Sequence, residues 1–524
     1  MKPAGPARRP AVLSTCDLPD AQQLLIHGCE DCACATSQDL YIRPPDIPSP
    51  VSPVGSGQWV RDRTVLDLPL DDEHRLLFNP AGTAGAVVLN MPAHRIFSCF
   101  EQPSTIRAAQ ARWAGPDDEV QDVASRLGRL GMIHPAGPAA AGRPARPAGA
   151  VRDSTVLTAW LHVTNACNLR CPYCYVRKSR DGMDESVGRA AVEAVIRSAA
   201  AHGFRAVKLK YAGGEASLND RLIVPLHAYA RDLAAQHGLQ LHATLLSNGV
   251  RLRPALVDAL KTNGIRVMIS LDGLADHHDA QRPFASGKPS FHRVERTIAQ
   301  LLEQNHPPHL SVTITSRNAR GVADVVRFAL ERDLTFSLNF FRDNECAAPF
   351  SDLRYEEQAM ISGLLEAFQV IEEFVPAWSV LGSVLDRGQL LEPRPQPCGV
   401  GENYVVIDQR GDVAKCHMEI EKTLGDVFHD DPLQLVRQDR RTVLNLLVDE
   451  KEGCRDCTWR YWCSGGCPVA TFRATGRYDI KSPNCNIYKA IYPQALRLEG
   501  LRLLKYSQPP PSLAGEQLTI ARSG

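Results

Sequence analysis

Between about residues 155 and 345, apolar runs alternate with amphipathic segments. Runs such as "TVLTAWLHVT", "AVKLKYAGG" and "RVMISLDG" predict strands, and segments such as "MDESVGRAAVEAVIRSAAAHG" and "FHRVERTIAQLLEQN" predict helices. The alternation contains six strand–helix units. It therefore predicts an α/β fold over residues 155–345, with a parallel sheet wound like a partial barrel.

A different pattern precedes this region. Two apolar runs around a Gly-containing turn in "HRLLFNPAGTAGAVVLN" predict a hairpin. "PSTIRAAQARWA" predicts a short helix, and "DDEVQDVASRLGRLGMI" a longer one with Val120, Val123, Leu127 and Leu130 on one face. Hairpin, short helix and longer helix over residues 61–134 indicate a small winged-helix-like domain.

The remaining boundaries follow from composition. Residues 1–60 are rich in Pro, Ser and Ala and are expected to form a mostly irregular arm. Residues 135–154 are an Ala/Pro linker, residues 346–397 a helical connector, residues 398–490 a cysteine-rich domain, and residues 491–524 a helix with a loose tail.

Bulk composition narrows the function classes. The chain has 524 residues, 44% hydrophobic and 23% charged, with 59 basic and 59 acidic side chains. This balance gives no electrostatic reason to expect nucleic acid or an anionic membrane as partner. There is no apolar run long enough to span a bilayer and no secretory h-region, so we expect a cytoplasmic protein without a membrane partner.

Cysteine is the unusual residue, with 16 in the chain. In a cytosolic protein, clustered cysteines more often bind metal than form disulfides. Three of them, Cys167, Cys171 and Cys174, follow the first barrel strand with Cys-x3-Cys-x2-Cys spacing in "CNLRCPYCY". Three thiolates are too few to close a zinc site or to ligate all four irons of a cluster, so a position is left open or a ligand such as His162 comes from elsewhere.

This motif resembles that of the radical S-adenosylmethionine (SAM) enzymes. The resemblance implies that the three thiolates hold a [4Fe–4S] cluster, whose free iron binds SAM and whose electron cleaves it to a 5′-deoxyadenosyl radical. Active residues of such barrels lie at the carboxyl ends of the strands. The segments "AGGE", "SNG" and "SLDG" follow the second, third and fourth predicted strands, so they are predicted there. The resemblance implies SAM contacts for a set of strand-end residues: Tyr173, Gly213, Gly214, Glu215, Ser247, Asn248, Ser270 and Arg282.

Their expected roles differ. Gly213 and Gly214 let the backbone approach closely, and Glu215 can accept from the SAM ammonium group. Arg282, twelve positions after Ser270, is expected to pair with the SAM carboxylate, and Tyr173 to lie near the adenine. Ser247 and Asn248 lie where a ribose or methionine contact is expected.

Seven further cysteines resemble the SPASM domain of radical SAM maturases, which carries two auxiliary iron–sulfur clusters. The resemblance implies one cluster on Cys454, Cys457, Cys463 and Cys485, and another on Cys398, Cys416 and Cys467. The second set is one ligand short. Either Cys346 completes it or an iron is left open for substrate; a pair of structural zinc sites is the alternative to both clusters.

The winged-helix-like region resembles the PqqD-like domain, which binds the leader of a precursor peptide by adding it as a strand at a sheet edge. A structural winged helix and a DNA-reading one are the alternatives. The "CEDCAC" segment, with Cys29, Cys32 and Cys34, either binds metal with Cys16 or His27, or carries incidental thiols.

These resemblances imply a radical SAM peptide maturase that oxidatively modifies, most simply by cross-linking, a ribosomally made precursor peptide. A reducing partner such as flavodoxin or ferredoxin is expected. One alternative is a sulfatase-maturase-like enzyme making formylglycine; where that group has an aspartate base, this chain has His417. His417 and Glu215 are the candidate catalytic residues. The other alternative is a non-catalytic, metal-stabilised peptide-binding scaffold.

Overall fold

The structure is a computed structural model that describes residues 9–14, 57–82, 84–137, 155–354 and 356–507. Within this part, six parallel strands follow one another across a sheet in chain order, as the alternating pattern predicted. The strands are β8 (Val156–Thr164), β9 (Ala206–Gly213), β10 (Gln240–Ser247), β11 (Ile265–Ser270), β12 (His309–Ile314) and β13 (Phe336–Phe340).

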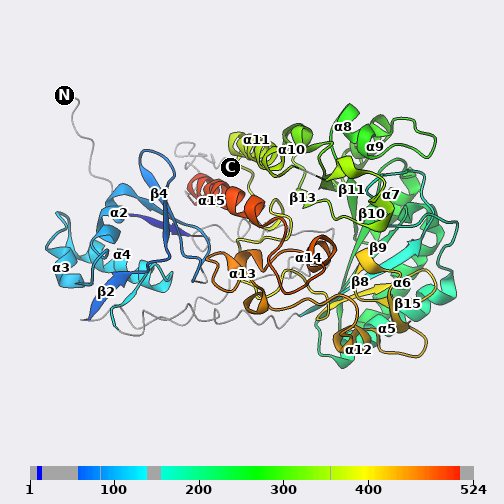
Figure 1. The fold of residues 1–524 in the computed structure, drawn as a ribbon, viewed down its shortest axis with the longest axis horizontal. Coiled ribbons are helices and arrows are strands. Elements are labelled where there is room, and N and C mark those ends of the chain that lie inside the picture. The colour runs from blue at the N-terminus through cyan, green and yellow to red at the C-terminus, as the bar shows by residue number, and fades with distance from the viewer. Residues whose placement is uncertain (1–8, 15–56, 83, 138–154, 355, 508–524) are drawn as a thin grey trace, which may run out of the picture.

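Helices connect these strands and cover the outer face of the curved sheet, on the right of Figure 1. They are α5 (Glu185–Ala201), α6 (Asp220–Gln236), α7 (Pro254–Thr262), α8 (Ala275–Gln281), α9 (Phe291–Glu303) and α10 (Val322–Leu330). Alternate residues of each strand pack against them, as Leu157, Ala159 and Leu161 of β8 do in the main core. Because the strands are parallel, their carboxyl ends meet at one edge.

The cysteine-rich region extends this sheet, which the sequence did not predict. Strand β14 (Tyr404–Ile407) pairs in parallel with β8, and Asn403 Nδ2 donates to Val156 O at 2.9 Å beside that pairing. Strands β15 (Asp412–Ala414) and β16 (Thr423–Asp426) continue outward as antiparallel strands. The expected helical connector contains α11 (Glu357–Phe374). The cysteine-rich region contains α12 (Pro432–Gln438), α13 (Arg460–Cys463), α14 (Pro468–Thr475) and the start of α15 (Cys485–Tyr506).

Residues 58–135 form a smaller unit with its own core. Its helices are α2 (Met91–Ser98), α3 (Ile106–Gln110) and α4 (Asp117–Arg129). Its strands are β2 (Gln58–Arg61), β3 (Leu66–Pro69), β4 (His74–Phe78), β5 (Val87–Asn90), β6 (Ser104–Thr105) and β7 (Ile133–Pro135). The expected hairpin is the antiparallel pair of β4 and β5, and the expected short and longer helices are α3 and α4.

Two elements in the chain's first part were not predicted. Strand β1 (Val12–Ser14) lies in the arm that was expected to be mostly irregular, and it pairs with β5. Helix α2 was not predicted, although the Asn90 side chain caps it by accepting from Ala93 N at 3.0 Å. Cys16, Cys29, Cys32 and Cys34, most of the linker and the tail lie outside the described residues.

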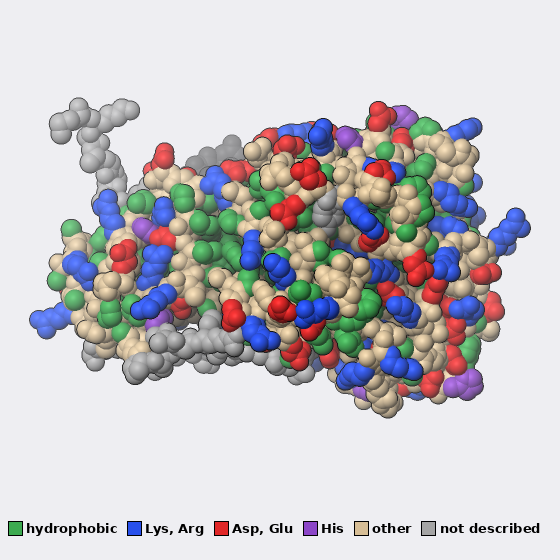
Figure 2. Space-filling model, in the orientation of Figure 1, with side chains coloured by type: hydrophobic (Ala, Val, Ile, Leu, Met, Phe, Trp, Pro, Cys, Tyr) green, Lys and Arg blue, Asp and Glu red, His purple; other side chains and the backbone are tan. Residues whose placement is uncertain are grey.

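On the face seen in Figure 2, Lys and Arg side chains are interspersed with Asp and Glu. No helix among the described residues is long and apolar enough to cross a membrane.

Candidate active site

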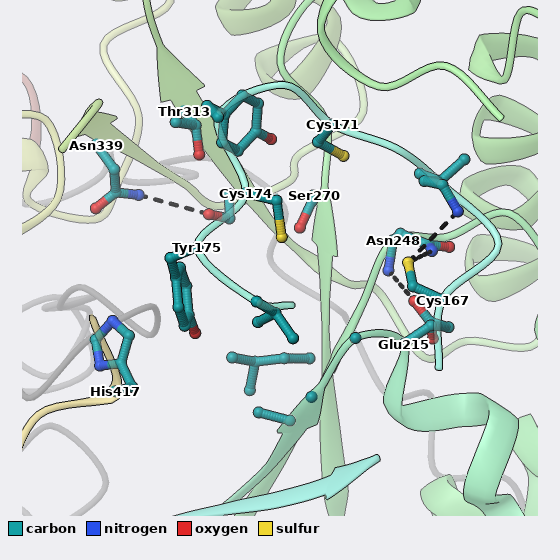
Figure 3. A pocket seen from close by; sticks show the side chains of 18 of the residues that line it. Cys167, Cys171, Cys174, Tyr175, Glu215, Asn248, Ser270, Thr313, Asn339 and His417 are labelled. Atoms are coloured by element: carbon teal, nitrogen blue, oxygen red, sulfur yellow. Dashed lines mark hydrogen bonds between the residues drawn. The ribbon is translucent and has the colours of Figure 1, made fainter. Parts of the chain in front are cut away.

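A cavity of about 220 Å³ lies at the carboxyl ends of the barrel strands (Figure 3). Cys167, Cys171 and Cys174, on the loop after β8, line one part of it. The lining includes every residue for which a SAM contact was expected: Tyr173, Gly213, Gly214, Glu215, Ser247, Asn248, Ser270 and Arg282. Residues from separate strands thus converge on one space beside three thiols.

Two glycines let the cysteine loop lie directly on the end of β9. A Cβ on Gly213, whose φ is +153°, would be 2.3 Å from Thr164 O, and one on Gly214 would be 2.4 Å from Ala166 O. Contacts this short are excluded for a real side chain. In their place, Gly214 N donates to Thr164 O at 2.7 Å, which fixes the start of the loop.

The Glu215 carboxylate ties β9 to β10. It is buried and accepts hydrogen bonds from Ser247 Oγ at 2.8 Å and from Asn248 N at 2.6 Å. It also accepts from Ser217 N at 3.2 Å and Ser217 Oγ at 2.6 Å. Asn248 Nδ2 in turn points to Cys167 Sγ at 3.7 Å (Figure 3). Glu215 therefore positions the residues beside the first thiol.

Lys178 contacts a cysteine of the loop, and the sequence pattern did not identify it. Its ammonium group donates to Cys174 Sγ at 3.0 Å. Burial acts to lower the pKa of Lys178, yet this pKa is raised, because the Cys174 and Cys167 thiols favour the cation. It lies four residues after the last cysteine, in "CYVRK", where spacing alone gave no reason to choose it.

Asp272 is the second residue that was missed. Its fully buried carboxylate accepts from Tyr173 Oη at 2.6 Å, from Arg282 Nε at 2.8 Å and from the backbone N–H of Thr313 at 2.9 Å. Arg282, expected to pair with a SAM carboxylate, is thus paired with Asp272 here, and it also lies 5.5 Å from the centre of the Tyr173 ring. Asp272 stands in the "SLDG" segment, but its partners come from distant segments.

His417 forms the opposite side of the cavity, with Tyr175 lying between it and Cys174 (Figure 3). Its ring stacks on Trp160 with centroids 4.6 Å apart, and its Nδ1 lies 3.0 Å from Tyr404 Oη. Burial, and then nearby cations including Arg387, hold the pKa of His417 well below its usual range. The imidazole is therefore neutral, the form that accepts a proton.

Four of the later cysteines share a second, small cavity. Cys454, Cys457, Cys463 and Cys485 line it together. Trp459, Tyr488 and Tyr492 form its aromatic side, and α15 begins at Cys485 itself, six residues before the predicted helix. Burial raises the pKa of Cys463 to about 12 and that of Cys454 to about 11.

Cys398, Cys416 and Cys467 pack together in another apolar cluster. Burial acts to raise the pKa of Cys467, but Arg342 and Arg387 lower it overall. Both arginines also line the first cavity, and neither was predicted. Cys346 lies elsewhere, with its Sγ 3.8 Å from Tyr175 O.

The donor set consists of thiols, the ligand type that iron–sulfur clusters take from proteins. The cysteines named here are free thiols, and no group of three or more Cys, His, Asp or Glu in the described residues is arranged to hold one metal ion. Four of the thiols line one cavity, and four cysteines are the usual protein ligands of a [4Fe–4S] cluster.

Comparison with known proteins agrees with this geometry. Residues 161–329 match the model of the radical SAM superfamily. The sporulation killing factor maturation protein SkfB of Bacillus subtilis is 30% identical over 185 residues, covering 35% of this chain and 42% of SkfB. An uncharacterised protein of Methanocaldococcus jannaschii is 29% identical and is covered over 57% of its length. The chain thus spans about half the length of these two relatives.

Other matches extend further along the chain. A cysteine-type anaerobic sulfatase-maturating enzyme of Clostridium perfringens is 23% identical over 334 residues, which are 58% of this chain and 86% of the enzyme. The structure of anSMEcpe with bound AdoMet and the Cp18Cys peptide aligns with a TM-score of 0.54 at 19% identity, over 67% of this chain and 99% of that one. The fold is therefore shared with a protein whose structure holds bound AdoMet, and residues 161–329 are similar to the radical SAM superfamily.

Proposed function

We propose that this protein is a radical SAM enzyme that oxidatively modifies a ribosomally made precursor peptide, most simply by forming a cross-link in it. The observation that carries the proposal is the cavity. Three thiols on one loop, the strand-end residues and a neutral histidine from the cysteine-rich region line the same space. The thiols, which would hold a cofactor, and the histidine, which would meet a peptide side chain, thus face one cavity.

Cys167, Cys171 and Cys174 would hold a [4Fe–4S] cluster, with SAM in the cavity beside it. When bound, the cluster and SAM supply a carbon radical that abstracts a hydrogen atom. The protein's own residues position the groups: Glu215 fixes the strand ends, and Asp272 orients Arg282 toward the cavity wall. Abstraction depends on holding a C–H bond close, so this rigidity matters more than acid or base strength.

His417 is proposed to take a proton from the peptide during its oxidation. Trp160 and Tyr404 hold the imidazole at the cavity wall, in reach of a side chain that enters the cavity. The set of Cys454, Cys457, Cys463 and Cys485, and the set of Cys398, Cys416 and Cys467, would each hold an auxiliary cluster. The second set would then have one iron left open for substrate, or Cys346 as a fourth ligand. We favour the open iron, because Cys346 Sγ contacts Tyr175 O.

The unit of residues 58–135 is proposed to bind the leader of the peptide. Three of its strands form a four-stranded sheet with β1 in the order β1-β5-β4-β3, so β1 and β3 are the edge strands. An extended peptide gains affinity at such an edge through main-chain hydrogen bonds. A flavodoxin or ferredoxin is proposed as the reductant.

The test uses the peptide that a short open reading frame beside the gene encodes. The encoded peptide should bind the protein through its N-terminal part and, with SAM and reductant, lose a pair of hydrogen atoms for each cross-link in the mass spectrum. Removing the leader should abolish the reaction. A peptide that binds, and whose presence supports SAM cleavage without any change in its mass, would contradict the cross-linking proposal.

A sulfatase-maturing activity is the second candidate, because the matched sulfatase maturase covers more of the chain than SkfB does. It predicts conversion of Cys or Ser to formylglycine in a short sulfatase peptide that has no leader. A His417→Asp variant should then be at least as active as the wild type. If the protein is a cross-linking enzyme, the same variant should form no formylglycine in the sulfatase peptide.

A further inference from the structure

Lys451 is buried in an unusual position. Only 1% of the residue is exposed, and its ammonium group donates to Ser464 O at 3.3 Å. Within the part of the chain that the structure describes, it forms no ion pair with a carboxylate. A buried cation without a counter-charge costs several kcal/mol, so something else must favour it here.

The surroundings of Lys451 are cysteines from both auxiliary sets. Burial lowers its pKa, and the thiols act in the opposite direction. Those thiols are Cys454 and Cys463 of the four-cysteine set, and Cys398 and Cys467 of the three-cysteine set. The side chain contacts the turn of residues 464–466, which joins Cys463 of the four-cysteine set to Cys467 of the three-cysteine set. Its position is therefore at the junction of the two sets.

The local backbone makes room for this side chain. Ser464, Gly465 and Gly466 all have left-handed φ values, of 53°, 76° and 69°. A Cβ on Gly465 would lie 2.6 Å from Lys451 Cδ and 2.8 Å from Lys451 Nζ, so a side chain there would displace the ammonium group. The lysine thus packs directly on the "SGG" turn between Cys463 and Cys467.

From this geometry we propose that Lys451 is a shared cation of the two auxiliary clusters that raises the reduction potential of both. The inference rests on the proposed function, since it requires those clusters. A cluster becomes more negative when it gains an electron, and a nearby fixed positive charge stabilises that reduced state. A positive charge between two clusters raises the reduction potential of both. A residue that only fills space has no such effect on either potential.

The experiment uses the full chain with Cys167, Cys171 and Cys174 changed to Ala, so that only auxiliary clusters remain. Lys451→Met keeps much of the side-chain volume and removes the charge. After anaerobic reconstitution, a redox titration followed by electron paramagnetic resonance should show both potentials lowered. We expect a change of at least tenfold in each one-electron equilibrium, or about 59 mV. Lys422→Met, the same change at a side chain that is 54% exposed, should leave both unchanged.

The outcomes separate the inference from the function on which it rests. Too little iron in the background protein with Lys451 intact would refute the auxiliary clusters themselves. Full iron with unchanged potentials in Lys451→Met would overturn the shared cation, and so would a shift in one cluster alone. If Lys451→Met binds no iron, Lys451→Arg decides: wild-type iron and potentials support a charge effect, and the same loss overturns it.

Discussion

At the scale of single residues, the cavity wall depends on two buried carboxylates, each of which accepts several hydrogen bonds. Asp272 accepts from Tyr173, Arg282 and a backbone N–H, and Glu215 accepts four hydrogen bonds. Each joins segments that are far apart in sequence. Such groups are costly to leave unpaired, which makes their removal a sensitive test of the site.

Asp272→Asn should destabilise the protein by about 3–5 kcal/mol, because it leaves the buried Arg282 guanidinium without its counter-charge. The measurement is the free energy of unfolding in urea. Asp352→Asn is the matched control: Asp352 also pairs with an arginine, Arg317, but its side chain is 61% exposed. That pair should be worth at most about 1 kcal/mol. Equal losses in the two variants would contradict this account of Asp272.

Gly214→Ala should displace the cysteine loop, because its Cβ would be 2.4 Å from Ala166 O. We expect reconstituted iron to fall by about four atoms per chain, the content of one cluster, with the auxiliary clusters retained. Gly182→Ala is the control, since its Cβ would make only ordinary contacts of 3.7 Å near the same loop. Full iron in Gly214→Ala would show that the loop does not need this close approach.

At the scale of secondary-structure elements, the barrel and the cysteine-rich region share one sheet. Every residue of β8 is buried, and β14 covers the edge that β9 leaves free. Without β14 the main-chain groups along that edge of β8 would be open to other chains.

Truncation after residue 397 should therefore yield a barrel that aggregates or lacks fixed tertiary structure. Near-ultraviolet circular dichroism and size-exclusion chromatography measure this outcome. A soluble, monomeric fragment with cooperative unfolding would show that the β8–β14 pairing is dispensable. The full-length chain under identical conditions is the control.

Sequence patterns predicted the elements whose signals are local. Strands β8 to β13 are apolar runs separated by helices, and Cys167, Cys171 and Cys174 stand within one short segment, as do Cys454, Cys457 and Cys463. Strand β14 has only four residues, and its parallel partner lies some 250 positions earlier, so the apolar run "YVVI" gave no indication of the pairing. Lys178, Asp272 and Arg342 escaped notice for the same reason: their roles come from contacts, not from spacing.

At the scale of the whole molecule, the small unit of residues 58–135 is joined to the cysteine-rich region, at the centre of Figure 1. Phe78 of β4 packs against Trp459 and Trp462, at centroid distances of 5.6 Å and 4.7 Å. Trp462 Nε1 donates to Pro80 O at 2.9 Å. Both tryptophans come just before Cys463, at the start of and within α13, so the proposed leader-binding unit contacts the helix that carries a proposed cluster ligand.

Phe78→Ala should destabilise the whole protein by about 3–5 kcal/mol, because it opens a cavity in the shared core. The unfolding transition, followed by tryptophan fluorescence and by the visible absorbance of the clusters, should shift as one event. Phe100→Ala, a change within the small unit's separate core, is the comparison and should affect that unit more than the clusters. Loss of fluorescence long before loss of the clusters in Phe78→Ala would contradict the coupling.

The most direct measurement of the central claim is the iron and sulfide content of the anaerobically reconstituted protein, followed by addition of SAM and dithionite. The account predicts about twelve irons per chain and formation of 5′-deoxyadenosine. In the variant with Cys167, Cys171 and Cys174 changed to Ala, it predicts about eight irons and no deoxyadenosine. Zinc in place of iron, or iron without SAM cleavage, would contradict the account and favour a metal-stabilised peptide-binding scaffold.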